Sequence, residues 1–309
     1  MDGIILLYYK YVTITNPQEI MLWLRGLCTR LNLKGRIIIG TEGINGTVGG
    51  SAEEIESFKA AFLAHPLFGD VDLKESPGSA ADFPRLSIKV RNEIVALGIN
   101  PDQLTAADAG ERLSPEDVHL LIENNKDLVI LDTRNDYESR IGAFRNAVTP
   151  TLKSFRDFPR YIDDNLEKFK DKEVLMYCTG GIRCERATAY LNVKKVAKKV
   201  YHINGGICRY VEQYPDGFFR GKNYVFDDRI ALKVNDDILT NCDICKKPSD
   251  VYANCMNASC NSQFIGCRQC FERYEYMCSS ACYEAVKQGL HKMRAQRIVA
   301  ALDRETVVP

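Results

Sequence analysis

The stretch that most constrains this chain is Met176–Tyr190, which reads MYCTGGIRCERATAY. An apolar, strand-like segment leads into it and a helix-like segment follows, so the sequence predicts a strand–loop–helix unit with Cys178 at the end of the strand. Gly180 and Gly181 let the backbone curl tightly at this point. A tight curl ahead of a helix points several N–H groups at one atom, which binds anions and lowers the pKa of a thiol.

Cys178 is therefore predicted to be a catalytic thiolate, and Arg183 to be the cation that closes the loop around it. The alternative, a buried structural cysteine beside a surface turn, leaves the glycines and the arginine without a packing role. The residues between the two form the candidate active-site loop: Thr179, Gly180, Gly181 and Ile182. Cysteine phosphatases place a longer run before their arginine to encircle a phosphate, whereas this shorter ring suits a smaller group, such as a sulfane sulfur.

The segment Cys178–Arg183 resembles the active-site loop of rhodanese domains, in which the cysteine carries a persulfide. The resemblance extends to the earlier strand 127–132, which an acid and an arginine follow, here Asp132 and Arg134. We expect these two side chains to pair or to cap the backbone rather than to act directly in catalysis. Strands and helices alternate over residues 114–220, which predicts a rhodanese-like α/β domain with a parallel sheet and its nucleophile at the carboxyl edge.

Cys184 lies six residues after Cys178, in the first turn of the predicted helix. It could resolve a persulfide or a sulfenic acid on Cys178 by forming a disulfide with it. Alternatively, it is a small buried residue that packs the helix on the sheet. The sequence leaves both roles open.

Residues 1–97 predict a ferredoxin-like α+β domain. Apolar, β-rich runs alternate with two amphipathic helices in the order β-α-β-β-α-β. Asn16 and Pro17 are predicted to begin the first helix, and Ser51 is a candidate cap for the second, with Glu54 as its capping-box partner. This domain carries no cofactor motif of its own, because hairpin turns explain its glycine-rich segment at least as well as a phosphate site does.

Residues 221–309 form a cysteine-rich C-terminal region. Eight of the chain's 12 cysteines lie here in four pairs: Cys242 and Cys245, Cys255 and Cys260, Cys267 and Cys270, Cys278 and Cys282. Four thiolates hold one tetrahedral zinc ion, so these cysteines predict about two structural zinc ions. Sequential, cross-braced and outer-with-inner pairings are all open. Disulfides are the alternative, which a reducing compartment disfavours.

Two basic clusters are candidates for contacts with RNA phosphates. A terminal helix predicted over residues 284–302 would carry a basic face made of Lys287, His291, Lys292, Arg294 and Arg297. The other cluster consists of Lys194, Lys195, Lys198 and Lys199. A merely solvated surface is the alternative for both clusters. The 41 basic and 41 acidic residues cancel, so net charge does not itself indicate a polyanionic partner.

No segment of the sequence directs the chain to a membrane. The start lacks a basic region, and the apolar run Ile4–Val12 is interrupted by Lys10 and is too short to span a bilayer. A reactive thiol among 12 cysteines favours a reducing environment. We therefore expect a cytoplasmic protein without a membrane partner.

Three segments together resemble the rhodanese-related tRNA uridine hydroxylase family: GTEGINGT at 40–47, CTGGIRCE at 178–185 and the eight-cysteine tail. The resemblance spans nearly the whole chain. It implies hydroxylation of the wobble uridine in the tRNA anticodon loop to 5-hydroxyuridine, with molecular oxygen as co-substrate. It also places Cys178 at the catalytic position of that family.

Two other functions fit part of the sequence. A sulfurtransferase would pass sulfane sulfur from a Cys178 persulfide to a thiol or RNA acceptor, and a zinc-dependent RNA-binding module would not need the intact loop. The residues reveal neither a dinucleotide fingerprint nor a two-histidine, one-carboxylate iron site, so they identify no electron donor. A thiolate alone does not activate oxygen. Two hypotheses for Cys178 are addition to carbon 6 of uracil and a peroxidic or sulfenic intermediate.

Overall fold

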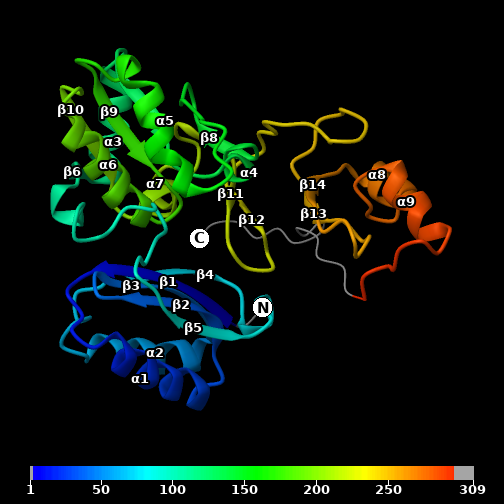
Figure 1. Ribbon diagram of the computed structural model, residues 1–309, viewed down its shortest axis with the longest axis horizontal. Coiled ribbons are helices and arrows are strands. Elements are labelled where there is room, and N and C mark those ends of the chain that lie inside the picture. The colour runs from blue at the N-terminus through cyan, green and yellow to red at the C-terminus, as the bar shows by residue number, and fades with distance from the viewer. Residues whose placement is uncertain (1–2, 296–309) are drawn as a thin grey trace. The chain divides into compact units, whose positions relative to one another are not determined.

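The computed structural model describes residues 3–295. These residues fall into two compact units, of which the first holds residues 3–136 and 144–219 and the second holds residues 137–143 and 220–295. Figure 1 traces the chain through both. No helix among these residues combines the length and the apolar character that a bilayer span requires.

The N-terminal part of the first unit is a five-stranded sheet with two helices on one face (Figure 1). Its elements are β1 (Gly3–Tyr11), α1 (Pro17–Arg30), β2 (Lys34–Gly40), β3 (Gly43–Ser51), α2 (Ala52–Leu63), β4 (Lys74–Pro77) and β5 (Leu86–Val90). The strand order is β4-β1-β3-β2-β5, so the predicted ferredoxin-like arrangement is confirmed and β5 extends it. Both helices begin at the predicted caps, Asn16 and Ser51, whose side chains accept hydrogen bonds from Glu19 N and Glu54 N.

Side-chain alternation decides which face of this sheet the helices cover. Leu6 and Tyr8 of β1 have no exposed surface and belong to the core between the sheet and the two helices. Because successive side chains of a strand point to opposite faces, Leu7, Tyr9 and Tyr11 project from the other face. This second face, which we call the open face, has no helix of its own domain packed on it.

The rest of the first unit is built on a four-stranded parallel sheet with the order β6-β10-β9-β7. Its elements are β6 (Glu111–Leu113), α3 (Pro115–Asn124), β7 (Val129–Asp132), α5 (Phe158–Asp164), β9 (Glu173–Tyr177), α6 (Ile182–Lys194), β10 (Lys199–Ile203) and α7 (Gly206–Gln213). Val174 of β9 lies opposite both Val129 of β7 and Val200 of β10, so β9 is an inner strand. The predicted rhodanese-like parallel sheet is confirmed.

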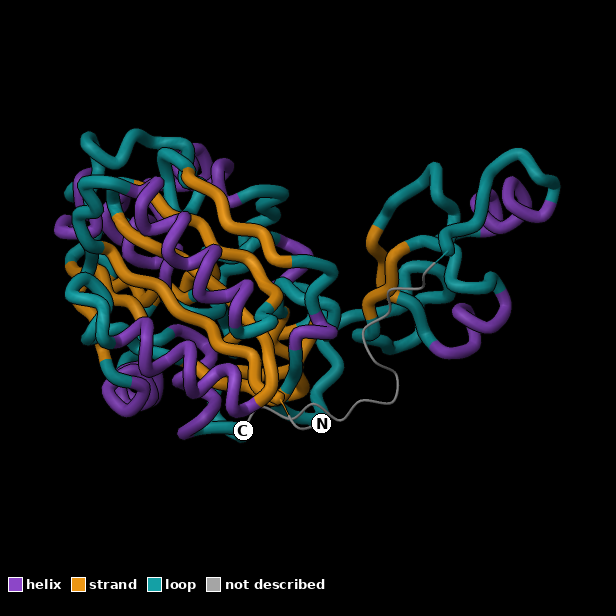
Figure 2. The backbone as a smooth tube through the Cα atoms, turned by 90° about the horizontal axis from the view of Figure 1, so that it is seen from below, coloured by secondary structure: helices purple, strands orange, loops and turns teal. Residues whose placement is uncertain are grey.

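The second unit consists mostly of loops, with short strands and helices between them (Figure 2). Its elements are α4 (Asp136–Ser139), β8 (Gly142–Phe144), β11 (Phe219–Tyr224), β12 (Ala231–Lys233), β13 (Tyr252–Asn254), β14 (Gln263–Ile265), α8 (Arg268–Arg273) and α9 (Ser280–Lys287). Strands β8, β11 and β12 form one small sheet, and β13 pairs with β14. Cysteines contribute to the core around α8 and α9, as the predicted cysteine-rich region requires.

The terminal helix predicted over 284–302 is wrong as far as the structure describes it. Helix α9 ends at Lys287, and Gly289 follows in the left-handed conformation with φ of 72°. The chain then turns back, and Arg294 N donates a hydrogen bond to Met256 O at 2.8 Å. This pairing with the cysteine-rich segment replaces the hydrogen bonds of a continued helix. Arg297 and the end of the predicted helix lie outside the described residues.

Candidate functional site

The candidate nucleophile lies where β9 ends. Cys178 follows the strand directly, and α6 begins at Ile182. Between them, Gly181 adopts a left-handed conformation with φ of 102°, which residues with a side chain rarely adopt. Its N–H donates a hydrogen bond to Cys178 Sγ at 3.2 Å. The loop therefore aims a backbone donor at the sulfur, as an anion-binding nest does.

The turn between β10 and α7 braces this loop. Gly206 packs so closely that a Cβ at this position would lie 2.5 Å from Cys178 O. Ile207 N donates to the same carbonyl at 2.9 Å, and Cys208 N donates to Thr179 O at 3.0 Å. A larger residue at position 206 would displace the loop backbone.

The surroundings of the Cys178 thiol favour its ionised form. Burial of this side chain, which has no exposed surface, raises its pKa. A hydrogen bond from Cys184, the charge of Arg183 and the N–H groups of Arg183 and Gly181 together outweigh burial and lower the pKa to about 6. Burial, reinforced by the neighbouring Cys178, holds the pKa of Cys184 well above its usual value. Cys178 is then a thiolate at neutral pH, and Cys184 is the thiol that donates to it.

Cys184 is fully buried, and its Sγ lies 3.8 Å from Thr133 Oγ1. Thr133 in turn donates a hydrogen bond to Tyr177 O at 3.0 Å. These contacts hold the start of α6 against the ends of β7 and β9. The position of Cys184 suits both predicted roles, because it packs the helix on the sheet and also lies beside Cys178.

Arg183→Lys is expected to raise the pKa of Cys178. Lysine keeps the charge but loses the planar fork of arginine, whose Nη2 lies 3.5 Å from Thr179 Oγ1. Alkylation by iodoacetamide, followed by mass spectrometry of the Cys178 peptide, reports the thiolate fraction. The wild-type rate should increase with pH and reach half of its plateau at about 6, and the midpoint of the variant should be higher by about one unit. An unchanged midpoint would contradict this role of Arg183.

Asp132 and Arg134 form a buried ion pair. Arg134 Nε lies 2.9 Å from Asp132 Oδ1, and Arg134 Nη2 lies 2.6 Å from Asp132 Oδ2. Both side chains have no exposed surface, and the guanidinium lies 5.5 Å from the ring of Tyr177. Because each charge is neutralised by the other, this geometry favours a structural role at the end of β7.

A charged cluster that the sequence did not single out lies on the first turn of α6. Glu185 is buried, pairs with Arg112, and accepts a hydrogen bond from Tyr9 Oη at 3.1 Å. Burial raises the pKa of Glu185 despite these two partners, and Cys178 contributes in the same direction. His202 Nε2 lies 3.8 Å from the other carboxylate oxygen of Glu185. Burial and Arg112 lower the pKa of His202 to about 4, so this imidazole is neutral.

Strand β1 reaches the catalytic loop with the open face of its sheet. A Cβ added at Gly180 would lie 3.0 Å from Leu7 Cδ2, and Tyr11 Oη donates to Ile182 O at 3.4 Å. The N-terminal sheet is therefore one wall of the candidate active site. The sequence does not indicate this wall, because its residues are far from the loop along the chain and carry no motif.

Arg186 joins the two parts of the first unit. Its side chain is fully buried, donates to Glu42 Oε2 at 2.9 Å and donates to Ile99 O at 2.7 Å. Removing one partner of such a buried pair costs about 3–5 kcal/mol. Glu42 lies in the GTEGINGT string, and Arg186 follows the CTGGIRCE string directly. The two sequence signals are thus in physical contact.

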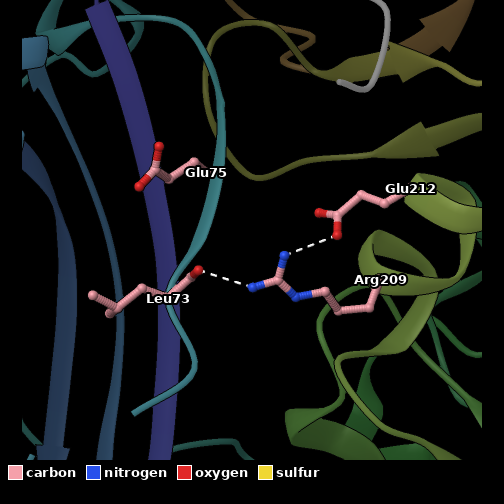
Figure 3. Close-up of a pocket in the computed structure, with 4 residues that line it drawn as sticks. All are labelled: Leu73, Glu75, Arg209 and Glu212. Atoms are coloured by element: carbon pink, nitrogen blue, oxygen red, sulfur yellow. Dashed lines mark hydrogen bonds and ion pairs between the residues drawn. The ribbon is translucent and has the colours of Figure 1, made fainter. Parts of the chain in front are cut away.

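A pocket beside this wall is lined by Leu73, Glu75, Arg209 and Glu212 (Figure 3). Arg209 donates to Glu212 Oε2 at 2.8 Å, to Leu73 O at 3.0 Å and to Asp72 Oδ1 at 2.6 Å. Two carboxylates already neutralise this guanidinium. Its contacts therefore hold the segment just before β4 against α7 and leave little positive charge for a ligand.

The eight C-terminal cysteines gather into two groups of four. Cys242, Cys245, Cys267 and Cys270 form one group, and Cys255, Cys260, Cys278 and Cys282 form the other, with the sulfur atoms of each group within 4.8 Å of one another. The pairs therefore alternate between the groups, which is the cross-braced arrangement. All eight are free thiols. The sequence predicted the ligands but left the pairing open.

The spacing of the sulfur atoms fits a tetrahedral metal ion. Sγ of Cys245 lies 3.5 Å from Sγ of Cys267, and Sγ of Cys278 lies 3.7 Å from Sγ of Cys260 and of Cys282. Four sulfur atoms around one zinc ion are about 3.8 Å apart, whereas the sulfur atoms of a disulfide are about 2 Å apart. Each group can hold one metal ion.

The predicted lysine cluster is largely neutralised. Lys194 lies 2.6 Å from Asp163, Lys199 lies 2.6 Å from Glu111, and Lys198 lies 3.5 Å from Glu173. In the other predicted basic cluster, Lys287 pairs with Glu275 at 2.6 Å and Arg294 donates to Asn261. The lysine cluster therefore offers less positive charge than its sequence suggests, whereas in the second cluster an acid neutralises Lys287 and Arg294 keeps its charge beside a neutral amide.

Three family models match the chain, one after another. The UPF0176 acylphosphatase-like domain matches residues 3–94, the rhodanese-like domain matches residues 114–213, and the rhodanase C-terminal model matches residues 220–283. Among solved structures, a rhodanese-like domain protein from Staphylococcus aureus is 22% identical and covers 32% of this chain and 90% of its own, with a TM-score of 0.28.

Curated relatives match almost the whole chain. A tRNA uridine(34) hydroxylase from Corynebacterium jeikeium is 43% identical over 276 residues, which are 86% of this chain and 89% of the relative. Another tRNA uridine(34) hydroxylase, from Pseudarthrobacter chlorophenolicus, is 40% identical over 292 residues, which are 90% of this chain and 98% of the relative. With this identity over most of its length, the chain belongs to the tRNA uridine(34) hydroxylase family.

Proposed function

We propose that this chain hydroxylates the wobble uridine of tRNA to 5-hydroxyuridine, with molecular oxygen as co-substrate and Cys178 as the catalytic residue. The name of its relatives supports the reaction. The observation that carries the assignment of the site is the Cys178 loop, where a backbone N–H at 3.2 Å and Arg183 favour a thiolate. An unpaired base of the anticodon loop can splay out toward such a small site at a cost of a few kcal/mol.

In this proposal Cys178 acts as a nucleophile, and Arg183 stabilises negative charge beside it. Addition of the thiolate to carbon 6 of uracil would make carbon 5 nucleophilic, and a peroxidic or sulfenic intermediate on Cys178 is the alternative. One oxygen atom then enters the C5–H bond and the other leaves as water. The balance requires two electrons and two protons, which a separate electron donor supplies. The loop residues Thr179, Gly180, Gly181 and Ile182 hold these groups in place.

The proposal assigns a role to each domain. Residues 114–220 form the catalytic domain, residues 1–97 form one wall of the site, and residues 221–309 form a region that zinc stabilises. Cys242, Cys245, Cys267 and Cys270 would hold one zinc ion, and Cys255, Cys260, Cys278 and Cys282 the other. Because every ligand is a thiolate and no coordination position is open, zinc would be structural. Action on tRNA in a reducing compartment fits a cytoplasmic protein.

The second candidate is a sulfurtransferase, which the short loop between Cys178 and Arg183 favours. Nucleoside analysis of tRNA from a strain that lacks the gene distinguishes the two. Loss of 5-hydroxyuridine is the expected result. Loss of a thiolated nucleoside, with 5-hydroxyuridine unchanged, would instead identify sulfur transfer and overturn the proposal.

A further inference from the structure

The open face of the N-terminal sheet carries exposed cations on strands β2 and β5. Ile37 and Ile39 of β2 belong to the helix-side core, so Arg36 projects from the open face. Strand β5 is the neighbour of β2, and Lys89 lies opposite Ile38 in the register. Arg36 and Lys89 are both exposed on this face. We call the cations on and beside these strands the β2–β5 strip: Lys34, Arg36, Arg85, Lys89 and Arg91.

The charge of this strip is not neutralised. None of its five residues forms an ion pair with another residue in the range 3–295. Strands β2, β3 and β5 contain no aspartate or glutamate at all. The predicted lysine cluster on the rhodanese-like domain is different, because acids pair with three of its four lysines. A positive potential therefore develops over the strip although the chain has no net charge.

The sheet connects this strip to the catalytic loop. Leu7 lies opposite Thr47, Thr47 lies opposite Arg36, and Arg36 lies opposite Ser87, so one row of side chains crosses β1, β3, β2 and β5. Leu7 is the residue that contacts the loop at Gly180. Neighbouring strands are about 4.8 Å apart, so the backbone of Arg36 is about 10 Å from β1 along this row. A chain of nucleotides on the open face could reach from the strip to the loop.

We propose that the β2–β5 strip binds the phosphate backbone of the single-stranded RNA loop whose base enters the Cys178 site. The inference rests on the proposed function, since it assigns the surface that holds the same substrate. Charge complementarity supports the inference, because the strip presents arginine and lysine side chains without acids and a phosphodiester chain is a regular polyanion. The sheet face of a small α+β domain is also a common platform for single-stranded RNA.

The test compares two double variants of the full-length protein. Arg36→Ala with Lys89→Ala removes two charges from the strip, and Lys198→Ala with Lys199→Ala removes two charges from the neutralised cluster. Both pairs are exposed, so both variants should fold. The probe is a synthetic RNA hairpin with an anticodon loop and a wobble uridine, and its affinity is measured over a range of salt concentrations.

The strip variant should bind the hairpin about tenfold more weakly at low salt. The plot of log affinity against log salt has a negative slope, and the magnitude of this slope should decrease by about 1.4 for two lost phosphate contacts. The control variant should bind like the wild type. Equal affinities and slopes for both variants and the wild type would overturn the proposal. Displacement of the hairpin by polyglutamate as readily as by unlabelled RNA would also overturn it, because the strip would then be a site for acidic protein.

The proposed function can fail separately from the strip. If the strip variant binds and modifies tRNA like the wild type while Cys178→Ser loses modification, the strip assignment is wrong and the function stands. If the wild-type chain restores no 5-hydroxyuridine to tRNA of a deletion strain, the function is wrong whatever the hairpin binds.

Discussion

Cys178→Ser is expected to reduce formation of 5-hydroxyuridine by at least about a thousandfold while leaving the fold intact. Serine is nearly isosteric with cysteine, but its hydroxyl is a far weaker nucleophile at neutral pH. The features that lower the pKa of Cys178 to about 6, such as Arg183 and the Gly181 N–H, cannot ionise a serine hydroxyl at that pH. Nucleosides of tRNA from deletion cells that carry the variant measure the effect.

Two further variants make this result specific. Cys28→Ala removes another fully buried thiol, in the core of the N-terminal domain, and should leave modification unchanged per folded molecule. Cys184→Ser keeps a hydroxyl donor beside Cys178, so a packing role predicts partial activity and a resolving role predicts none. Modification at the wild-type level by Cys178→Ser would refute the catalytic assignment.

Loss of zinc should unfold the second unit. Structural zinc in small thiolate sites contributes apparent binding free energies of about 10–16 kcal/mol, and this unit consists mostly of loops. Elemental analysis of the wild type should find about two zinc ions per chain. Treatment with a strong chelator should make all eight C-terminal cysteines reactive to alkylation.

Double substitutions test the cross-braced pairing. Cys242→Ser with Cys267→Ser disrupts one group, so about one zinc ion should remain; Cys242→Ser with Cys255→Ser disrupts both groups, so none should remain. Sequential pairing predicts the reverse. Absence of metal from the wild type, together with eight thiols that react in the native protein, would contradict zinc altogether.

The features that could be predicted from sequence are those encoded locally. The helix caps at Asn16 and Ser51 and the strand–loop–helix around Cys178 each depend on residues a few positions apart. The cysteine spacing likewise predicted tetrahedral ligand sets. It could not select the partners, because Cys242 and Cys267 meet only after the intervening chain has folded.

The features that escaped prediction depend on distant residues. In the sequence, Glu185 is an ordinary acidic residue at the start of a helix. Only the folded chain brings Tyr9 and Arg112, which belong to other elements, into contact with it. The predicted terminal helix failed for the same reason, because Arg294 bonds to the cysteine-rich segment instead of to the preceding turn. The amphipathic periodicity of a segment does not reveal that a distant segment will compete for its backbone hydrogen bonds.

The origin of the oxygen atom added at the wobble position tests the proposed hydroxylation most sharply. Deletion cells that carry the wild-type chain are grown under oxygen gas enriched in the heavy isotope, and nucleosides from their tRNA are analysed by mass spectrometry. We expect 5-hydroxyuridine that contains the heavy isotope in cells that carry the wild-type chain, and no 5-hydroxyuridine in cells that carry Cys178→Ser. A nucleoside with only ordinary oxygen, or a wobble uridine that stays unmodified with the wild-type chain, would contradict the proposed hydroxylation.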